Sequence, residues 1–482
     1  MPYTNLQSFA PEIWLCVLGI LVLCADLVLP ARRRAAVPVL AAVGLLVCLK
    51  PVLDLWGGAP STEFHGSFAI DGLSLFIKAF AMFAGAIIIV LSVDFFRRSP
   101  AYGEFFSLVV FLVLGVSLLA GATDLVLIYL SFEFVSLTSY LLAAWNKKDP
   151  KSNEAGMKYF IYGAAASGVM LYGMTLVYAA GGSTNLFIAA ESMMKPIPGA
   201  GLALPAALGL VLMLVGFGYK VSMAPFHAWA PDVYEGSPTP VAALFSVAPK
   251  AAGLAVLMRV LFTLSPGLEL PWQMVLAVLA CLTMFVGNLL AIRQTDIKRM
   301  LAYSSIAHAG YMLIAVVVGP DELWGMPGLL IYLAAYLFMN LGLFAVAIAL
   351  ERHTGDAAIE SFAGLGKTAP ALAILTFIFL LSLTGIPPTA GFLGKLYIFA
   401  AAIKSRQWAW LAVVGIVNSV ISLYYYMNIA RLMYFDQRPG VRPGTAPVGV
   451  LPVIVFMAAG TLLLFLFPEA LIEAARTVLM VR

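Results

Sequence analysis

Charged residues are scarce in this sequence. Only 11% of the 482 residues are Asp, Glu, Lys or Arg, whereas 62% are hydrophobic and the mean hydropathy is +0.98. Soluble domains are about 25% charged and about 45–50% apolar. A soluble fold of this length could not cover so much apolar surface with so few charges. The composition therefore excludes a soluble fold and predicts a membrane protein whose surplus apolar surface faces lipid.

Cysteine is rare too, and it is not placed for chemistry. Cys16, Cys24, Cys48 and Cys281 all lie inside apolar runs, without the spacing of a metal or haem site. We interpret them as small buried hydrophobic residues. The sequence also lacks a glycine-rich dinucleotide fingerprint, a phosphate loop and an iron–sulfur cysteine run. These absences exclude a soluble redox domain within this chain.

Long apolar runs are abundant. A helix that spans a bilayer needs about 20 predominantly apolar residues. Fourteen runs meet this need, near 12–30, 37–55, 72–92, 104–120, 124–145, 156–180, 203–224, 238–264, 272–292, 299–318, 326–350, 370–404, 407–434 and 448–468. We predict an all-α polytopic membrane protein in which residues 1–482 form a single membrane domain of about 14 transmembrane helices.

The connections between these runs carry an uneven share of Lys and Arg. Of the 28 such residues, seventeen follow odd-numbered spans, six lie on the other side and five lie within spans. Because basic loops stay in the cytoplasm, both termini are expected on the non-cytoplasmic side. The net charge of +4 is then a signal of topology and does not indicate a nucleic-acid partner.

Two spans share an unusual pattern. The seventh ends in LVGFGYKVSMAPFHAW, with Lys220 five residues before Pro225, and the twelfth reads LSLTGIPPTAGFLGKLYIF, with Lys395 seven residues after Pro388 and a second proline at Pro387. Both combine a glycine, a helix-breaking proline and a lysine. The two spans are five apart, an odd number, so a repeated unit of five helices would be inverted. Broken helices in inverted repeats mark the ion sites of many transporters, although ordinary proline kinks are the alternative.

Four ionisable residues lie well inside apolar spans: Glu133, Lys220, Lys250 and Lys395. Each charge at the centre of a helix costs about 2.5–3.5 kcal/mol on insertion scales, so such residues usually have a function. The structural alternative is a buried ion pair, or a side chain that reaches the membrane surface. We favour that alternative for Lys78 and Arg259.

Lysine suits proton transfer in such a setting. Its reference pKa is about 10.4, and burial in an apolar interior can bring the pKa of a lysine near neutrality, whereas a nearby carboxylate opposes that change. The spans thus predict transport of protons or other cations. Polar residues at His227, His308 and Tyr303 are candidates for a relay between the charges, although a lone histidine is more often a packing residue.

These stretches resemble a known family. The segments APEIWLCVLGILVLCADLVLP, DLVLIYLSFEFVSLTSYLLAAW, GYKVSMAPFHAWAPDVYEGSPTPVAALFSVAPKAAG, DIKRMLAYSSIAHAGYM and GIPPTAGFLGKLYIF extend over nearly the whole chain. They are similar to the antiporter-like membrane subunits of respiratory complex I, the NADH–quinone oxidoreductase, and most of all to the N type. Lysine at 395 departs from the M type, which has glutamate there. The chain ends soon after the fourteenth span, without the lateral helix of the L type.

The resemblance implies a fold and a set of sites. The family has fourteen helices with inverted five-helix repeats at spans 4–8 and 9–13, here residues 104–264 and 272–434. It also implies that Glu133, Lys220, Lys250 and Lys395 are the residues of proton translocation, on the fifth, seventh, eighth and twelfth helices. Helices 7 and 12 would be broken, at Pro225 and at Pro387 and Pro388.

It further implies a subunit and not a complete enzyme. NADH, FMN, iron–sulfur clusters and quinone would be bound by other subunits, and this chain would bind no cofactor or metal. It would couple quinone reduction in its partners to proton pumping across the bacterial plasma (inner) membrane. The expected partners are the M-type subunit, the small K/J/A-type membrane subunits and the lipid bilayer.

Two alternatives remain open at this point. One is a proton-translocating subunit of a multi-subunit sodium/proton antiporter, which shares the fold and the charged residues. Neighbouring genes for redox subunits or for antiporter subunits would separate the two. The other is a scaffold without transport, which should tolerate an apolar substitution at Lys250.

Overall fold

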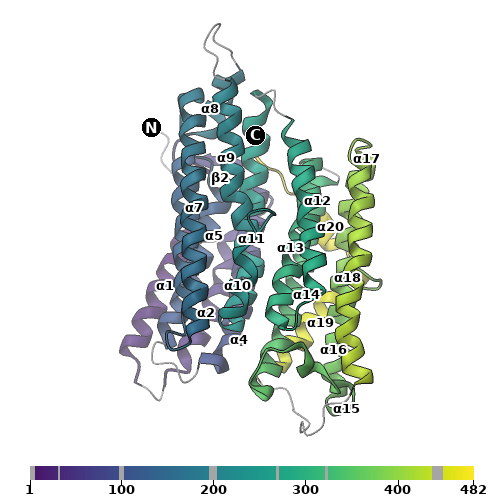
Figure 1. The fold of residues 1–482 in the computed structure, drawn as a ribbon. Coiled ribbons are helices and arrows are strands. Elements are labelled where there is room, and N and C mark those ends of the chain that lie inside the picture. The colour runs from purple at the N-terminus through teal and green to yellow at the C-terminus, as the bar shows by residue number, and fades with distance from the viewer. Residues whose placement is uncertain are drawn as a thin grey trace.

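Long helices make up nearly all of this protein. The computed structural model describes residues 6–30, 33–96, 102–194, 203–267, 271–320, 324–436 and 449–481. Figure 1 shows the long helices running roughly parallel, with α8 towards one end of the bundle and α15 towards the other. Seven of the cations used to orient the chain, Arg32, Arg97, Arg98, Lys195, Arg438, Arg442 and Arg482, lie outside the described residues.

The elements follow one another as a series of helices with one small hairpin. The first half contains α1 (Ala10–Val28), α2 (Ala36–Val47), α3 (Leu49–Leu55), β1 (Ser61–Glu63), β2 (Phe68–Ile70), α4 (Gly72–Phe96), α5 (Tyr102–Gly121), α6 (Leu125–Ala143), α7 (Pro150–Gly181), α8 (Leu186–Met194), α9 (Ala203–Val221), α10 (Trp229–Gly236) and α11 (Thr239–Leu264). The second half contains η2 (Ser265–Gly267), α12 (Trp272–Ala291), α13 (Ile297–Val318), α14 (Gly325–Thr354), η3 (Ile359–Phe362), α15 (Leu365–Thr368), α16 (Pro370–Thr384), α17 (Ala390–Lys404), α18 (Ala409–Phe435), α19 (Leu451–Leu466) and α20 (Glu469–Arg476).

Local sequence signals set many helix starts. The carboxylates of Asp124, Asp149 and Asp296 accept hydrogen bonds from backbone N–H groups in the first turns of α6, α7 and α13. Such N-caps satisfy donors that have no partner inside the helix. Helices α7 and α16 begin with proline, whose missing N–H is not needed there. These signals place the starts of these four helices.

Fewer than fourteen of the described helices are individually long and apolar enough to span a membrane. In the described part, twelve helices are long and apolar enough to cross a membrane, or thirteen if the bent pair α19 and α20 counts as one span. The expected twelfth span, at 370–404, is divided into α16 and α17, of 15 residues each. The prediction of a many-span helical membrane protein is confirmed, while the count of fourteen is not.

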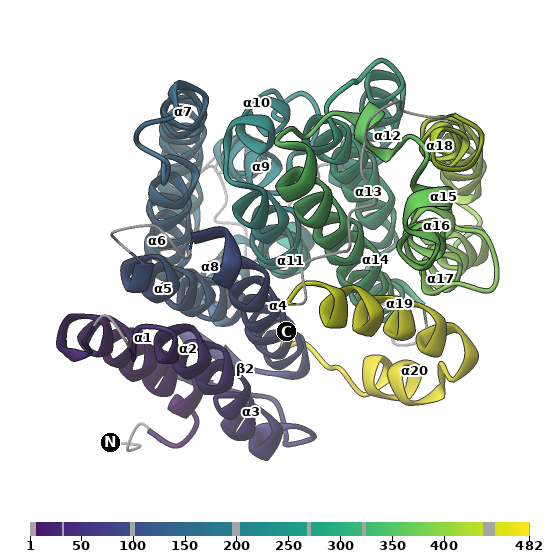
Figure 2. The ribbon, with the colours of Figure 1, turned by 90° about the horizontal axis from the view of Figure 1, so that it is seen from below.

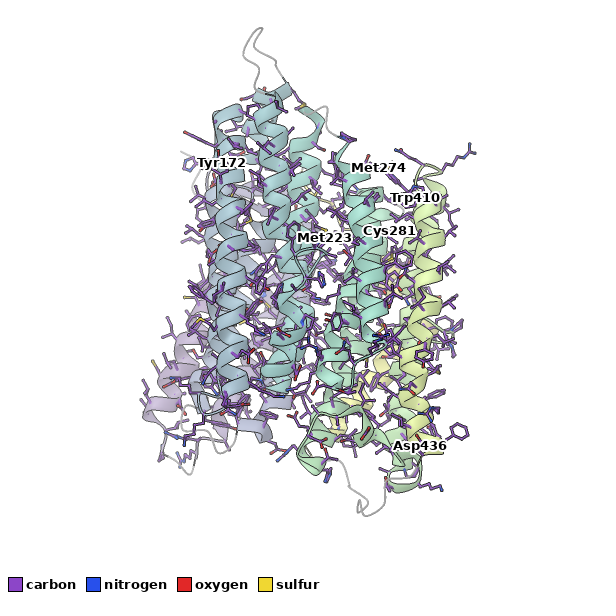
Figure 3. The ribbon with its side chains drawn as sticks, in the orientation of Figure 1. Tyr172, Met223, Met274, Cys281, Trp410 and Asp436 are labelled. Carbon is purple, nitrogen blue, oxygen red and sulfur yellow. The ribbon has the colours of Figure 1, made fainter. Side chains whose placement is uncertain are left out.

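Three helices form the centre of the molecule. Seen along the bundle, α11, α13 and α14 lie between α4–α10 on one side and α12 and α16–α18 on the other (Figure 2). Every residue of the most apolar stretch of α11 is buried, and nearly all of those in α13 and α14 are. Large apolar side chains of the outer helices, such as Tyr172, Met274 and Trp410, project outward (Figure 3). This distribution fits a protein whose outer face contacts lipid.

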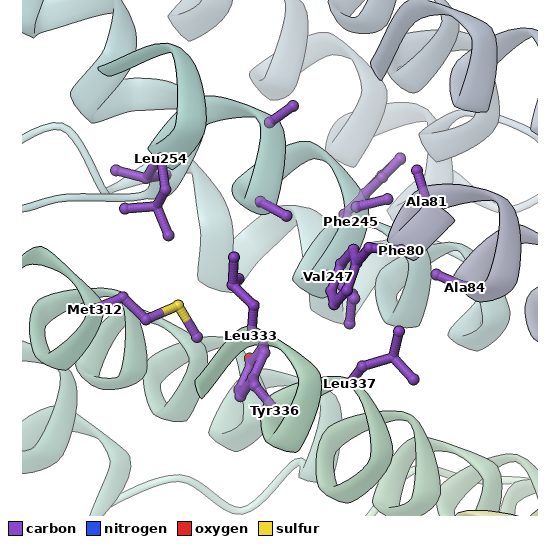
Figure 4. Close-up of a cluster of buried hydrophobic side chains, with 14 of the residues drawn as sticks. Phe80, Ala81, Ala84, Phe245, Val247, Leu254, Met312, Leu333, Tyr336 and Leu337 are labelled. Atoms are coloured by element: carbon purple, nitrogen blue, oxygen red, sulfur yellow. The ribbon is translucent and has the colours of Figure 1, made fainter. Parts of the chain in front are cut away.

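Apolar packing joins the two halves at the centre. Figure 4 shows side chains of α4, α11, α13 and α14 that meet in one buried cluster, among them Phe80, Ala84, Phe245, Met312 and Leu337. All five are at most 6% exposed. Polar side chains within this densely packed interior are costly unless they have hydrogen-bond partners, so the polar groups found there identify the candidate site.

Candidate functional site

Lys220 lies in the last turn of α9, which ends at Val221. An irregular segment then leads to α10, which begins at Trp229. Pro225 lies within this break. The ammonium donates to the Ser136 hydroxyl at 2.6 Å and lies 3.4 Å from the Phe132 carbonyl, with its nitrogen 4.1 Å from the centre of the Phe132 ring. A cation is favoured both at a helix C-terminus and over an aromatic face. The side chain is thus held by neutral groups of α6.

Glu133 is the nearest acidic residue to Lys220 on α6. It is half-buried, and its Oε1 atom is buried without a hydrogen-bond partner among the described residues. The two groups attract each other electrostatically, but the hydrogen-bond partners of the Lys220 ammonium are Ser136 and Phe132, and Glu133 is not among them. The sequence left open whether these residues meet. The structure places them near each other without direct contact.

Lys250 occupies the middle of α11, the most buried helix. Its ammonium donates to the hydroxyl of Ser305 on α13 at 2.7 Å, and the ring of Tyr234 on α10 lies 5.9 Å away. The side chain is 4% exposed. Among the described residues, no carboxylate lies within ion-pair distance of it. The central lysine therefore has a hydroxyl as its partner, contributed by the second half of the chain.

Lys395 lies on α17, directly beside the second break. Its ammonium donates to the carbonyls of Thr384 at 2.8 Å and Leu383 at 3.2 Å, at the C-terminal end of α16. The last carbonyls of a helix have no partner within the helix, so they are natural acceptors for a cation. The Tyr311 ring lies 4.7 Å from the nitrogen. The segment between α16 and α17 contains Pro387 and Pro388, so the break supplies the acceptors that hold this lysine.

His308 lies on α13, is 2% exposed, and interacts electrostatically with both Lys395 and Lys250. Its Nδ1 is 2.7 Å from the hydroxyl of Tyr332 and its Nε2 is 3.3 Å from that of Tyr426. Ser304, next to the partner of Lys250, is 2.5 Å from the Tyr426 hydroxyl. The histidine predicted as a relay is thus part of a connected polar group near the centre of the bundle.

The other two relay candidates are placed differently. His227 lies in the break between α9 and α10, half-buried, and its Nδ1 has no hydrogen-bond partner among the described residues. Tyr303 is half-buried on α13 and packs against the apolar core. The structure brings neither of them to His308.

Sequence reasoning missed a further polar group beside this site. Asn288 on α12 donates to the hydroxyl of Tyr311 and to the side chain of Asn418, each at 3.1 Å, and it accepts from Tyr425 at 3.0 Å. One signal could have indicated part of it: Ser304, His308 and Tyr311 are spaced four and three residues apart, which places them on one face of a helix. The partners on α12 and α18 have no such signal.

The cations set aside in the sequence do form buried ion pairs. Lys78 lies 2.9 Å from Glu12, with both side chains at most 1% exposed. Arg259 binds Asp71 through two hydrogen bonds, at 2.7 and 3.0 Å, with both side chains fully buried. Of the two structural alternatives considered for Lys78 and Arg259, the structure shows the buried ion pair. These pairs differ from Lys220, Lys250 and Lys395, whose hydrogen-bond partners are all uncharged.

A cluster of opposite charges connects α7, α10 and α13 at the end of the bundle away from the hairpin. Asp232 contacts Lys158 at 2.6 Å and Arg299 at 2.7 Å, while Glu235 contacts Arg299 at 2.9 Å and Lys151 at 3.2 Å. The cluster borders a cavity of about 260 Å³. Burial alone would raise the pKa of both carboxyls, but these cations hold the pKa of each below its usual value. The cluster fixes α10, which follows the first break.

A second cavity, of about 460 Å³, lies beside Lys395. Side chains of α16, α17 and α18 line it, including Thr384, Leu396 and Ile416, and its wall is mostly apolar. In the described part of the chain, no group of three or more His, Cys, Asp or Glu side chains could hold a metal ion. The site therefore consists of titratable and hydroxyl side chains, with a cavity beside Lys395. Such groups can hold and pass protons.

Comparison with known proteins gives a consistent result. The transmembrane family described as NADH:quinone oxidoreductase/Mrp antiporter matches residues 122–422. The NADH-quinone oxidoreductase subunit N of Trichlorobacter lovleyi is 39% identical over 479 residues, covering 98% of this chain and 96% of the relative.

Solved structures show the same similarity. A chain of respiratory complex I from Thermus thermophilus is 34% identical, with a TM-score of 0.82, and the match covers 97% of this chain and 100% of that one. A chain of the Mrp complex from Dietzia sp. DQ12-45-1b has a TM-score of 0.80 over 99% of this chain and 97% of its own, at 21% identity. The latter similarity is one of fold.

Proposed function

The chain belongs to the NADH:quinone oxidoreductase/Mrp antiporter family, and on this premise we propose that its buried lysines form a proton path. Its function is that of a proton-translocating membrane subunit, of the N type, in an NADH–quinone oxidoreductase. The full-length relative at 39% identity supports this function better than that of an Mrp antiporter subunit, for which the match has 21% identity.

The path that we propose begins at Glu133 and Lys220, continues through Lys250 and His308, and ends at Lys395. One observation carries it: the three lysines are 1–4% exposed, and each ammonium is held by hydroxyl or carbonyl oxygens instead of a carboxylate. A carboxylate partner stabilises the charged form of a lysine, whereas burial without one favours release of the proton. The cations Lys78 and Arg259 have carboxylate partners and stay outside the path.

The finer architecture is also part of the proposal. Counting α16 and α17 as one broken span, and α19 as another, gives fourteen. We assign residues 104–264 and 272–434 to two inverted repeats, in which Lys220 and Lys395 correspond. Each of these lysines lies beside a helix end that contains or precedes a proline break, which supports the assignment. Both termini would then face away from the cytoplasm of a bacterial inner membrane.

The setting of the subunit follows from the family. It works with other membrane subunits, since its structural relatives are chains of multi-subunit membrane complexes. The cofactors of the complex belong to other subunits, so the electron transfer takes place outside this chain. Of the partners, the M-type and small K/J/A-type subunits are those we propose at its flanks.

Substitution of Lys250 tests the proposal. Arginine keeps the charge but does not release its proton, because its pKa is above about 12. Lys250→Arg should therefore lose proton pumping nearly as fully as Lys250→Ala, in membranes matched for assembled complex. Lys404→Arg, the same change at an exposed position of α17, is the control and should pump normally. Near-normal pumping by Lys250→Arg, with loss only for alanine, would show a fixed structural charge.

A further inference from the structure

Both ring nitrogens of His308 are held by tyrosine hydroxyls from two different helices. Tyr332 belongs to α14 and contacts Nδ1 at 2.7 Å, while Tyr426 belongs to α18 and contacts Nε2 at 3.3 Å. All three side chains are at most 2% exposed. A neutral imidazole has one N–H donor and one bare nitrogen, and a hydroxyl can both donate and accept. One tyrosine must therefore donate to the ring while the other accepts from it.

This arrangement allows two neutral states. In one, Nδ1 carries the proton and Tyr426 donates to Nε2; in the other, Nε2 carries it and Tyr332 donates to Nδ1. The two states differ by the ring tautomer and by the rotation of two hydroxyls. Two neutral states that interconvert in this way are what a proton relay requires, since the ring returns to its starting charge after each passage.

The two tyrosines lead in different directions. The Tyr426 hydroxyl is also 2.5 Å from Ser304, which is adjacent in sequence to Ser305, the partner of Lys250. Tyr332 packs against the backbone of Gly394, so closely that a Cβ added there would lie 2.4 Å from the tyrosine ring. Gly394 immediately precedes Lys395. Tyr426 thus contacts a sequence neighbour of the residue that holds Lys250, and Tyr332 contacts a sequence neighbour of Lys395.

We propose that Tyr426 and Tyr332 are working residues of the proton path, which carry a proton across the His308 ring from the Lys250 side to the Lys395 side. This inference rests on the proposed function and adds two residues to it, on helices that the sequence did not single out. Water would bridge the two remaining gaps, from Ser305 to Ser304 and from Tyr332 to Lys395, as it does between many separated polar groups.

The transfer balances in protons. A proton that reaches the Tyr426 oxygen from the Ser304 side forms a new O–H bond as the original Tyr426 proton passes to Nε2. The Nδ1–H bond then breaks, and that proton moves to the Tyr332 oxygen as Tyr332 releases its own towards Lys395. Neither tyrosine nor the ring gains or loses charge, and rotation of the hydroxyls with reversal of the tautomer restores the starting state.

Phenylalanine substitutions test the inference, because they remove only the hydroxyl. Tyr426→Phe and Tyr332→Phe should each assemble and lower proton pumping per electron by about tenfold or more, since positioned proton-transfer groups typically contribute about 10²–10⁴. Tyr424→Phe is the control, because Tyr424 lies two residues before Tyr426 on α18 but is 65% exposed. It should pump within about twofold of the unmodified complex.

The outcomes separate this inference from the proposed function. Normal pumping by both tyrosine variants, with loss in Lys250→Ala, would overturn the role of the tyrosines alone. Normal pumping by Lys250→Ala as well would overturn the proposed path itself.

A second measurement covers variants that fail to assemble. Fluorotyrosine at position 426 keeps the hydroxyl and nearly the shape of the ring but makes the phenol more acidic. A hydroxyl that passes a proton should then change the pumping rate and its solvent deuterium isotope effect, while fluorotyrosine at position 424 should change neither. An unchanged rate and isotope effect at 426 would mean that Tyr426 only positions the histidine.

Discussion

Replacing Asp71 by asparagine should destabilise the protein by about 3–5 kcal/mol, the usual cost of leaving a buried charge without its partner. The Arg259 guanidinium binds both carboxylate oxygens, and neither side chain is exposed. Burial alone would raise the pKa of Asp71, but Arg259 and two backbone N–H donors hold it below its usual value, so the carboxyl is charged at neutral pH. The asparagine would leave the arginine charge uncompensated.

This loss of unfolding free energy is large compared with the stability of a typical domain, about 5–15 kcal/mol. The backbone N–H of Val481 also donates to Asp71, at 3.0 Å. The substitution should therefore also weaken the attachment of the segment after α20. The assay is the thermal unfolding of the purified complex, together with the amount of assembled complex in membranes. Asp54→Asn is the control, because its pair with Lys50 is exposed and such pairs contribute about 0–1 kcal/mol.

A double substitution decides between a charge effect and a packing effect. Asp71→Asn combined with Arg259→Met removes both charges, so that no buried charge is left without a partner. The double variant should therefore recover most of the stability lost in Asp71→Asn. A double variant as unstable as the single one, or a single variant within about 1 kcal/mol of the unmodified protein, would refute the reasoning.

Three further predictions concern the path, the topology and the charged cluster. Lys395→Met should assemble normally yet pump poorly in vesicles, because it removes the last titratable group of the path; full pumping would exclude Lys395. To test the topology, single cysteines are placed in the 147–158 and 183–200 connections of a chain freed of its own cysteines. An impermeant reagent should label them from opposite sides of the membrane, and labelling of both from the same side would contradict the topology. The pKa of Asp232 and that of Glu235 are lowered in the folded state. Their stabilising effect is therefore present above the unfolded carboxyl pKa of about 4 and is lost as the pH falls below it. Asp232→Asn should make thermal stability less dependent on pH in that acidic range, and an unchanged dependence would show that the cluster contributes nothing.

The sequence by itself determined the class of protein and the chemistry of its interior. Few charges and long apolar runs leave only a helical membrane fold, because every backbone polar group in lipid must be satisfied within its own helix. The same scarcity makes each intramembrane charge conspicuous, so Lys250 stands out in the sequence without any structure. Proline and glycine also act locally, and the interruptions near Pro225 and Pro388 were therefore predictable.

Only the tertiary structure decided which buried charges are paired. In the sequence, Lys78 and Arg259 resemble Lys250, since each lies in an apolar span. Packing gives the first two a carboxylate, from Glu12 and Asp71, and gives Lys250 a hydroxyl. Likewise, the tyrosines that hold His308 are 24 and 118 residues away from it. Contacts of this kind depend on how each helix is rotated and shifted against its neighbours. Those quantities are set by the packing of the whole bundle and leave no periodic signal in any one segment.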